Sequence, residues 1–254
     1  MKSQAVLNRF LPVVVVATCA AGLASTAGLQ ASAKASTGVV YVVQGLPGTV
    51  VNVQIDGRTV ATSAKATDVI GPLTLASGKR KLTVLSGGKV MLERMFTVKP
   101  SGNADLVVHR PASPVGAPVV TSFDNELAAV PADKASLTVA HTAAVPPSDI
   151  KVNGKVLFSN VANGESLHVV VPAATYMVQI VPTGASGPSI LGPASLTVKG
   201  GSLTNVYAIG EPTSGTMNVV VHVLGLPSTG TEKPAEVNTG TGGQAAAVGL
   251  TWPR

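Results

Sequence analysis

The chain contains one pattern twice, and this duplication limits the folds open to it. The stretch VVYVVQGLPGTVVNVQIDGRTVATS, from Val39, aligns without a gap on SLTVAHTAAVPPSDIKVNGKVLFSN, from Ser136, an offset of 97 residues. Gln44 then falls on His141. Further on, FTVKPSGNADLVV from Phe96 aligns on LTVKGGSLTNVYA from Leu196. Two copies are too few for a solenoid, so the repeat predicts two tandem globular domains, each near the length of one β-sandwich.

Each copy has the pattern of short strands joined by tight turns. Val51, Val53 and Ile55 alternate with polar residues, as expected of a half-buried strand. Asp56-Gly57 in one copy and Asn153-Gly154 in the other are typical of type I′ hairpin turns. KLTVLSGGKVMLERMFTV predicts a second hairpin with SGG at its tip. Since no stretch after the leader has capped helical periodicity, we predict an all-β chain: two tandem immunoglobulin-like or prealbumin-like antiparallel β-sandwiches.

The predicted order of segments follows from these patterns. VVTSF, from Val119, mirrors NVVVH, from Asn218, and so predicts the last strand of the first domain. We expect a signal peptide at 1–33, a first sandwich at 34–123, a linker at 124–134, a second sandwich at 135–225, and a flexible Gly/Thr/Pro-rich tail at 226–254.

The N-terminus has the three regions of a secretory signal peptide. Lys2 and Arg9 provide the positive charge, Phe10–Ala24 is apolar, and Ala31–Ala33 is a small-residue cleavage site. The apolar segment is short for a membrane span of about 20 residues. We therefore predict export with cleavage after Ala33. An uncleaved N-terminal membrane anchor is the alternative.

Cys19 is the single cysteine, and it lies within this leader. A lipoprotein anchored at Cys19 is a further alternative, although Thr18 stands where a small residue normally precedes the lipidated cysteine. Once the leader is removed, no cysteine remains. The mature protein is therefore predicted to be stabilised by packing without a disulfide.

The charge of the chain does not favour nucleic-acid binding. The net charge is +6, and without Lys2 and Arg9 it falls to 16 basic against 12 acidic residues, or +4. The densest basic run, Lys79–Lys81, has no aromatic residue beside it for base stacking. We interpret it as a solvated strand end and predict no nucleic-acid partner.

The motifs YVVQGLPGTVVNVQIDGR, VKPSGNADLVVH and VYAIGEPTSGTMNVVVHVL resemble the secreted bacterial proteins built on domain of unknown function 4397. This resemblance implies an exported protein of a high-GC Gram-positive bacterium with a sandwich-like fold. It implies no activity. Gln44 stands where that family often has His, and no role is transferred to this position.

The sequence offers no recognisable catalytic or metal motif. The histidines are His109, His141, His168 and His222, and none has the spacing of a zinc site. No G-x-S-x-G motif is present. We therefore predict no enzyme activity, and no catalytic, cofactor-binding or metal-binding residue.

The pentapeptide LPSTG, Leu226–Gly230, matches the sortase pattern L-P-x-T-G. The longest apolar run after it, AAAVGL, is far shorter than a membrane span. We interpret LPSTG as a loop after the last strand.

We expect a secreted structural or adhesive module, either free or held loosely at the cell envelope, whose partner is an extracellular protein or an envelope polymer. The mature chain is expected to have no stable membrane span. The alternatives are a small-ligand carrier or envelope sensor, and a hydrolase whose Ser, His and Asp come together only in the fold.

Overall fold

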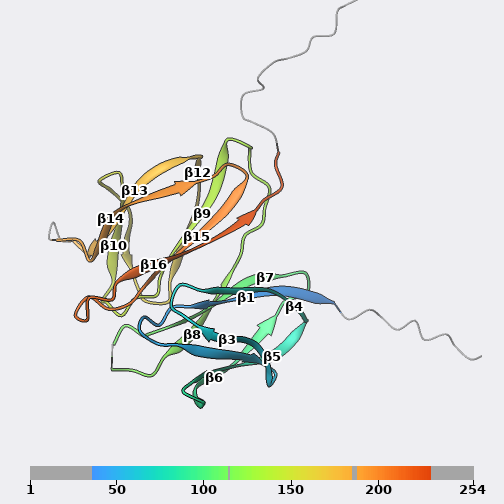
Figure 1. Ribbon diagram of the computed structural model, residues 1–254. Helices are drawn as coiled ribbons and strands as arrows, with labels where there is room; N and C mark the ends of the chain where they lie inside the picture. Colours follow the sequence, from blue (N-terminus) through green and yellow to red (C-terminus); the bar gives the residue numbers. More distant parts are fainter. Residues whose placement is uncertain (1–35, 114, 185–187, 230–254) are drawn as a thin grey trace, which may run out of the picture. The chain divides into compact units, whose positions relative to one another are not determined.

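The structure is a computed structural model, and it describes residues 36–113, 115–184 and 188–229. This part of the chain forms sixteen strands and no helix, in four sheets of four strands (Figure 1). The prediction of an all-β fold with two tandem sandwiches is confirmed. The predicted signal peptide, Cys19 and residues 230–254 of the predicted tail lie outside the described residues. No described segment is a helix that is long and apolar enough to cross a membrane.

The first sandwich consists of strands β1 to β8. Its first sheet has the order β4 (Val69–Ala76), β1 (Thr37–Gln44), β7 (Asn103–His109), β8 (Val119–Asp124). Its second sheet has the order β3 (Arg58–Ala64), β2 (Val51–Ile55), β5 (Gly78–Ser86), β6 (Lys89–Val98).

The second sandwich repeats this arrangement with β9 to β16. One sheet has the order β12 (Ser166–Pro172), β9 (Lys134–His141), β15 (Ser202–Ile209), β16 (Asn218–Gly225). The other has the order β11 (Lys155–Val161), β10 (Ser148–Val152), β13 (Ala174–Pro182), β14 (Leu191–Val198). Each strand of the first sandwich thus has one counterpart in the second, as the sequence repeat requires.

Strand pairing differs from the prediction in one respect. The pairs β1–β7 and β9–β15 are parallel, whereas the other pairs are antiparallel. The purely antiparallel prediction is wrong for these pairs because side chains alternate in the same way in both pairings, and the sequence pattern does not distinguish them.

The strand order also decides between the two predicted types of sandwich. The first two strands lie in different sheets, whereas an immunoglobulin sandwich places them in one. Of the two predicted sandwich types, the prealbumin-like one fits this order.

The predicted hairpin turns are confirmed by their backbone angles. Asp56 and Gly57 have φ of 49° and 80°, and Asn153 and Gly154 have φ of 49° and 79°. Positive φ at both turn residues is the mark of a type I′ turn. The SGG tip joins β5 to β6, with Gly87 and Gly88 also at positive φ.

A side chain supports an irregular strand at the same place in each copy. Ser63 and Asn160 have positive φ values, of 54° and 56°. The backbone N–H of Ser63 donates to Oδ1 of Asn52 at 2.8 Å, and that of Asn160 donates to Oδ1 of Asp149 at 2.8 Å. Both donors and both acceptors are related by the 97-residue offset, so the copies share this local device as well as their strand order.

Each sandwich is filled mainly by aliphatic side chains. Val51, Val53 and Ile55 are buried, as the alternation in β2 predicts. In the second sandwich the core includes Leu137 and Ile150. Because so few aromatic residues are present, the cores depend on the close packing of aliphatic side chains, mostly Val and Ile.

The start of the predicted tail is tied to the predicted linker. Val130 is buried, and its N–H donates to the carbonyl of Pro227 at 3.2 Å. The N–H of Thr229 donates to the carbonyl of Val130 at 3.1 Å. Leu226–Thr229, the described part of the LPSTG sequence, is therefore a hydrogen-bonded loop after β16.

Candidate functional site

The two sandwiches share an apolar cluster. It combines Val43, Val107 and Phe123 of the first with Ala140, Tyr207, Ile209 and Val220 of the second. The rings of Phe123 and Tyr207 lie 5.6 Å apart between centroids. These side chains point out of each sandwich, so they form a joint between the sandwiches and are separate from the two cores.

A carboxylate is buried in this joint with four hydrogen-bond donors around it. Oδ2 of Asp105 accepts from the hydroxyl of Tyr207 at 2.6 Å, Nδ1 of His222 at 2.8 Å and Nδ2 of Asn205 at 3.3 Å. Oδ1 accepts from Nδ2 of Asn125 at 2.8 Å. Burial, and then the Asp105 charge, raise the pKa of Tyr207 far above its ordinary value, so its hydroxyl stays a donor. A buried charge needs such complete pairing.

The joint is built from equivalent positions of the two copies. Asp105 and Asn205 correspond in the repeat, and they are bonded to each other across the joint. In a two-fold symmetric interface the same patch is used by both partners. The duplicated chain thus uses an approximate version of that symmetry, in which divergence placed the charge in one copy and an amide in the other.

His109 is fully buried at one end of β7. Its Nδ1 lies 2.7 Å from the carbonyl of Arg110, and its Nε2 lies 2.8 Å from Oγ1 of Thr121. Because a carbonyl only accepts, Nδ1 carries the proton and Nε2 accepts from the Thr121 hydroxyl. Burial lowers the pKa of His109 below its ordinary value, and the neighbouring His141 lowers it further.

His141 and Gln44 occupy equivalent positions and do the same structural work. Nε2 of Gln44 donates to the carbonyl of Thr49 at 3.0 Å, and Nε2 of His141 lies 3.3 Å from the carbonyl of Pro146. Oε1 of Gln44 also accepts from the N–H of Leu46. Nδ1 of His141 is buried without a hydrogen-bond partner. Burial lowers the pKa of His141.

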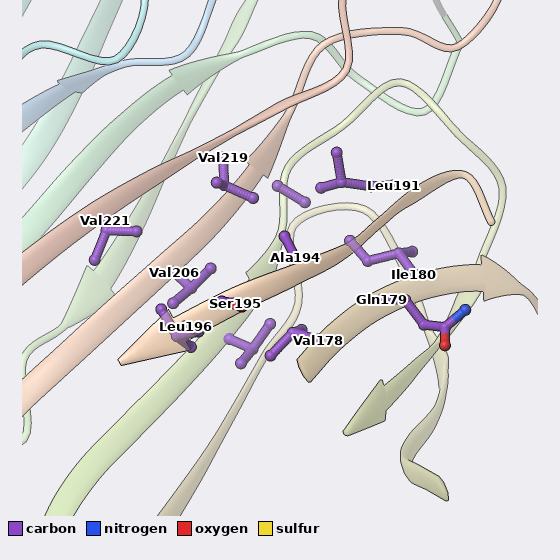
Figure 2. A pocket seen from close by; sticks show the side chains of 12 residues that line it. Val178, Gln179, Ile180, Leu191, Ala194, Ser195, Leu196, Val206, Val219 and Val221 are labelled. Atoms are coloured by element: carbon purple, nitrogen blue, oxygen red, sulfur yellow. The ribbon is translucent and has the colours of Figure 1, made fainter. Parts of the chain in front are cut away.

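An apolar cleft opens between the sheets of the second sandwich, beside the edge strands β14 and β16. Its volume is about 90 Å³. Figure 2 shows aliphatic side chains from both sheets along it, with the amide of Gln179 turned away from them. That amide donates to Oγ of Ser189 at 2.8 Å. The lining comes from β9, β13, β14, β15 and β16 and includes Ile180, Leu191, Val206, Val219 and Val221.

The first sandwich has a cleft at the equivalent place, but its chemistry differs. This cleft, of about 340 Å³, is lined in part by Arg94, Lys99, Ser122 and Asp124. Lys99 and Asp124 form an exposed ion pair that links the end of β6 to β8. The strand registers place Ser122 and Asp124 in the positions of Val221 and Val223. The cleft of the first sandwich is therefore partly polar, whereas that of the second is apolar.

The four histidines lie at different places in the fold. His109 and His141 lie in the joint region, His222 lies on Asp105, and Nδ1 of His168 lies 3.1 Å from Oγ1 of Thr138. Within the described ranges, no three His, Cys, Asp or Glu side chains are arranged to hold a metal ion.

Sequence reasoning missed both Asp105 and the apolar cleft. A signal for each exists in the repeat itself. Asp105 aligns with Asn205 inside a run of strand residues, and the polar pair Ser122 and Asp124 aligns with two valines. A polar residue at the same place in a buried strand of both copies indicates a buried polar contact. Polar residues in one copy that align with valines in the other indicate a surface whose role differs between the copies.

Residues 38–147 match the family model described as "Domain of unknown function (DUF4397)". No curated protein matches the sequence. Among solved structures, the chain is similar to a crystal structure of a candidate cell adhesion protein from Bacteroides eggerthii DSM 20697. That similarity has 8% sequence identity and a TM-score of 0.19, and it covers 78% of this chain and 98% of the other.

Proposed function

We propose that the chain, whose residues 38–147 match the DUF4397 family model of unknown function, is a secreted, non-enzymatic interaction module. It works outside the cell or at the cell envelope, where it holds a partner protein against the second sandwich. The first sandwich and the joint fix the position of β16, the edge strand beside the apolar cleft.

The apolar cleft of the second sandwich carries this proposal. Val221 is 43% exposed and Val223 is 49% exposed, although both lie on the face of β16 that points toward the opposite sheet. The first sandwich has Ser122 and Asp124 at these positions, and both are exposed. An exposed apolar surface at a position where the first sandwich is polar is typical of a site that a binding partner covers.

The polar groups in the joint favour a structural role over catalysis. Asp105 and His222 have the arrangement of two members of a Ser-His-Asp triad. However, Asp105 and Tyr207 are each 0% exposed, and the His222 ring lies 4.3 Å from that of Tyr41. Because a substrate needs access to the catalytic groups, a role for this pair in fixing the joint is the better account.

Carriage of a small apolar ligand is a second candidate, and the same cleft is the observation that favours it. Pockets for drug-sized ligands occupy about 300–1,000 Å³. The cleft, at about 90 Å³, is smaller and suits one or two aliphatic side chains. A side chain of a partner protein therefore fits better than a lipid. Native mass spectrometry of the protein purified from its host would detect a carried ligand as added mass.

The proposal is tested first by location and then by binding. Fractionation of host cells with intact-mass analysis should find residues 34–254 in the medium or the envelope fraction. Labelled protein should then bind host cells, and the double variant Val221→Ser, Val223→Asp should bind at least tenfold less. Val170→Ser is the matched control, since Val170 is 46% exposed on β12 of the same domain. A species that keeps Met1 in the cytoplasm, or equal binding by the cleft variant, would contradict the proposal.

A further inference from the structure

We propose that the partner segment binds as an added β-strand on the free edge of β16, with apolar side chains at every second position entering the cleft. This inference rests on the proposed function and specifies its partner: an extended stretch of another protein, uncharged where it faces the cleft.

The backbone groups of β16 that point away from β15 belong to the cleft residues. The carbonyl of Ala208 accepts from the N–H and the hydroxyl of Thr142, so it points away from β16. Val219, which lies opposite Ala208, donates its N–H to Oδ1 of Asn218 at 2.8 Å. The N–H and C=O groups of Val219 therefore point toward the free edge of β16, away from β15. Because these directions alternate along an antiparallel strand, the N–H and C=O groups of Val221 and Val223 point there too.

The same residues carry the exposed apolar side chains. Val219 and Val221 line the cleft, and Val223 follows two positions later on the same face. Among the described strands, β16 pairs with β15 alone. One extended segment would therefore pair with the free backbone groups and cover the valines at once, which is the way β-strand addition gives affinity and specificity.

Edge protection is missing from β16 and present on the other three edge strands that border the two clefts, β6, β8 and β14. Natural sheets guard exposed edges with charged residues, proline or bulges. Strand β6 carries Lys89, Glu93 and Arg94, and β8 carries Asp124. Strand β14 carries Pro193, and its pairing with β13 has a register shift. The eight residues of β16 include no Lys, Arg, Asp, Glu or Pro. Of the four edges beside the two clefts, this one is open to another strand.

The docking edge is continuous with the joint between the sandwiches. Val220 and His222 alternate with the cleft residues and are buried on the opposite face of β16, where His222 is bonded to Asp105. The strand is thus held in an extended form before a partner arrives. An edge that is already ordered costs less conformational entropy on binding.

The test uses the chain from residue 34 to 254 and a dye-labelled peptide, Thr-Val-Thr-Val-Thr-Val-Thr, measured by fluorescence anisotropy. The same peptide methylated at every second backbone nitrogen is the control, because it keeps the side chains and loses half of the hydrogen bonds. We expect at least tenfold weaker binding for the methylated peptide, and for the variant Val221→Ser, Val223→Asp. Val170→Ser should bind as the unmodified chain does. Hydrogen exchange should slow at the amides of Val221 and Val223 on binding.

Each other result overturns the inference in a distinguishable way. Equal binding of both peptides, with loss in the cleft variant, would keep the cleft as a partner site and exclude strand addition. Binding by a chain shortened after Thr229, but not by the full chain, would show that residues 230–254 themselves occupy the edge. If neither chain binds the peptide at millimolar concentration, strand addition is wrong, and binding to host cells decides the proposed function separately.

Discussion

Replacing Asp105 by Ala should separate the two sandwiches as folding units. The carboxylate accepts hydrogen bonds from Asn125 on the side of the first sandwich and from Asn205, Tyr207 and His222 of the second. Without it, four buried donors lose an acceptor in a place that water does not reach. The apolar contacts of the joint are then opposed by unsatisfied polar groups.

The size of the effect follows from these partners. A hydrogen bond to a charged group contributes about 1.5–3 kcal/mol, but removing Asp105 also removes the cost of burying its charge. Breaking a buried ionic group by deleting one member typically costs about 3–5 kcal/mol. For a chain of this length that loss corresponds to a fall in Tm of roughly 6–20 °C. Asp105→Asn, which installs the residue of the sister position, should lose less because it keeps one acceptor oxygen.

Differential scanning calorimetry is the suitable assay. The unmodified chain should unfold in one transition, and Asp105→Ala should show two, with the less stable sandwich unfolding first. Asp124→Ala is the matched control: its carboxylate is 60% exposed and paired with Lys99, and it should cost less than about 1 kcal/mol. A single transition for Asp105→Ala, with a loss no larger than that of Asp124→Ala, would refute the role assigned to the network.

Three further expectations concern the joint and its surroundings. Burial lowers the pKa of His109 and of His141, so the unfolded chain takes up protons before the folded chain does as the pH falls below about 6.5. The free energy of unfolding measured in urea should therefore fall from pH 7.5 to 5.5, by at most about 1.4 kcal/mol per pH unit for each histidine. A free energy of unfolding that stays constant over this range would contradict the expectation. His141→Gln introduces the residue found at the equivalent position, Gln44, and supplies an oxygen acceptor where Nδ1 of His141 has no partner. The variant should be at least as stable as the unmodified chain, with a gain of up to about 1 kcal/mol. Its free energy of unfolding should also change less with pH in the same urea experiments. Val130→Asp places a charge at a buried position of the linker and should speed limited proteolysis within 124–134, whereas an unchanged cleavage rate would show that the bonds to Pro227 and Thr229 do not hold the linker.

The repeat, the alternation and the turn chemistry were enough to predict two tandem β-sandwiches and many of their strands. Asp56-Gly57 and Asn153-Gly154 form the predicted turns because these residues adopt positive φ at little cost. Val51, Val53 and Ile55 are buried because a strand places alternate side chains on one face. Such features depend on neighbours along the chain, so a single sequence contains them.

Tertiary structure alone decided how distant strands meet. The parallel pairing of β1 with β7 leaves no local pattern in the sequence. Asp105 and His222 are 117 residues apart, and their contact depends on which face of each sandwich packs in the joint. The exposure of Val221 and Val223 depends on how the two sheets of the second sandwich pack, which a hydrophobic pattern does not contain, since buried and exposed valines look alike in sequence. Local sequence therefore determines the strands and turns, and long-range packing determines which polar groups are sealed and which apolar edge stays open.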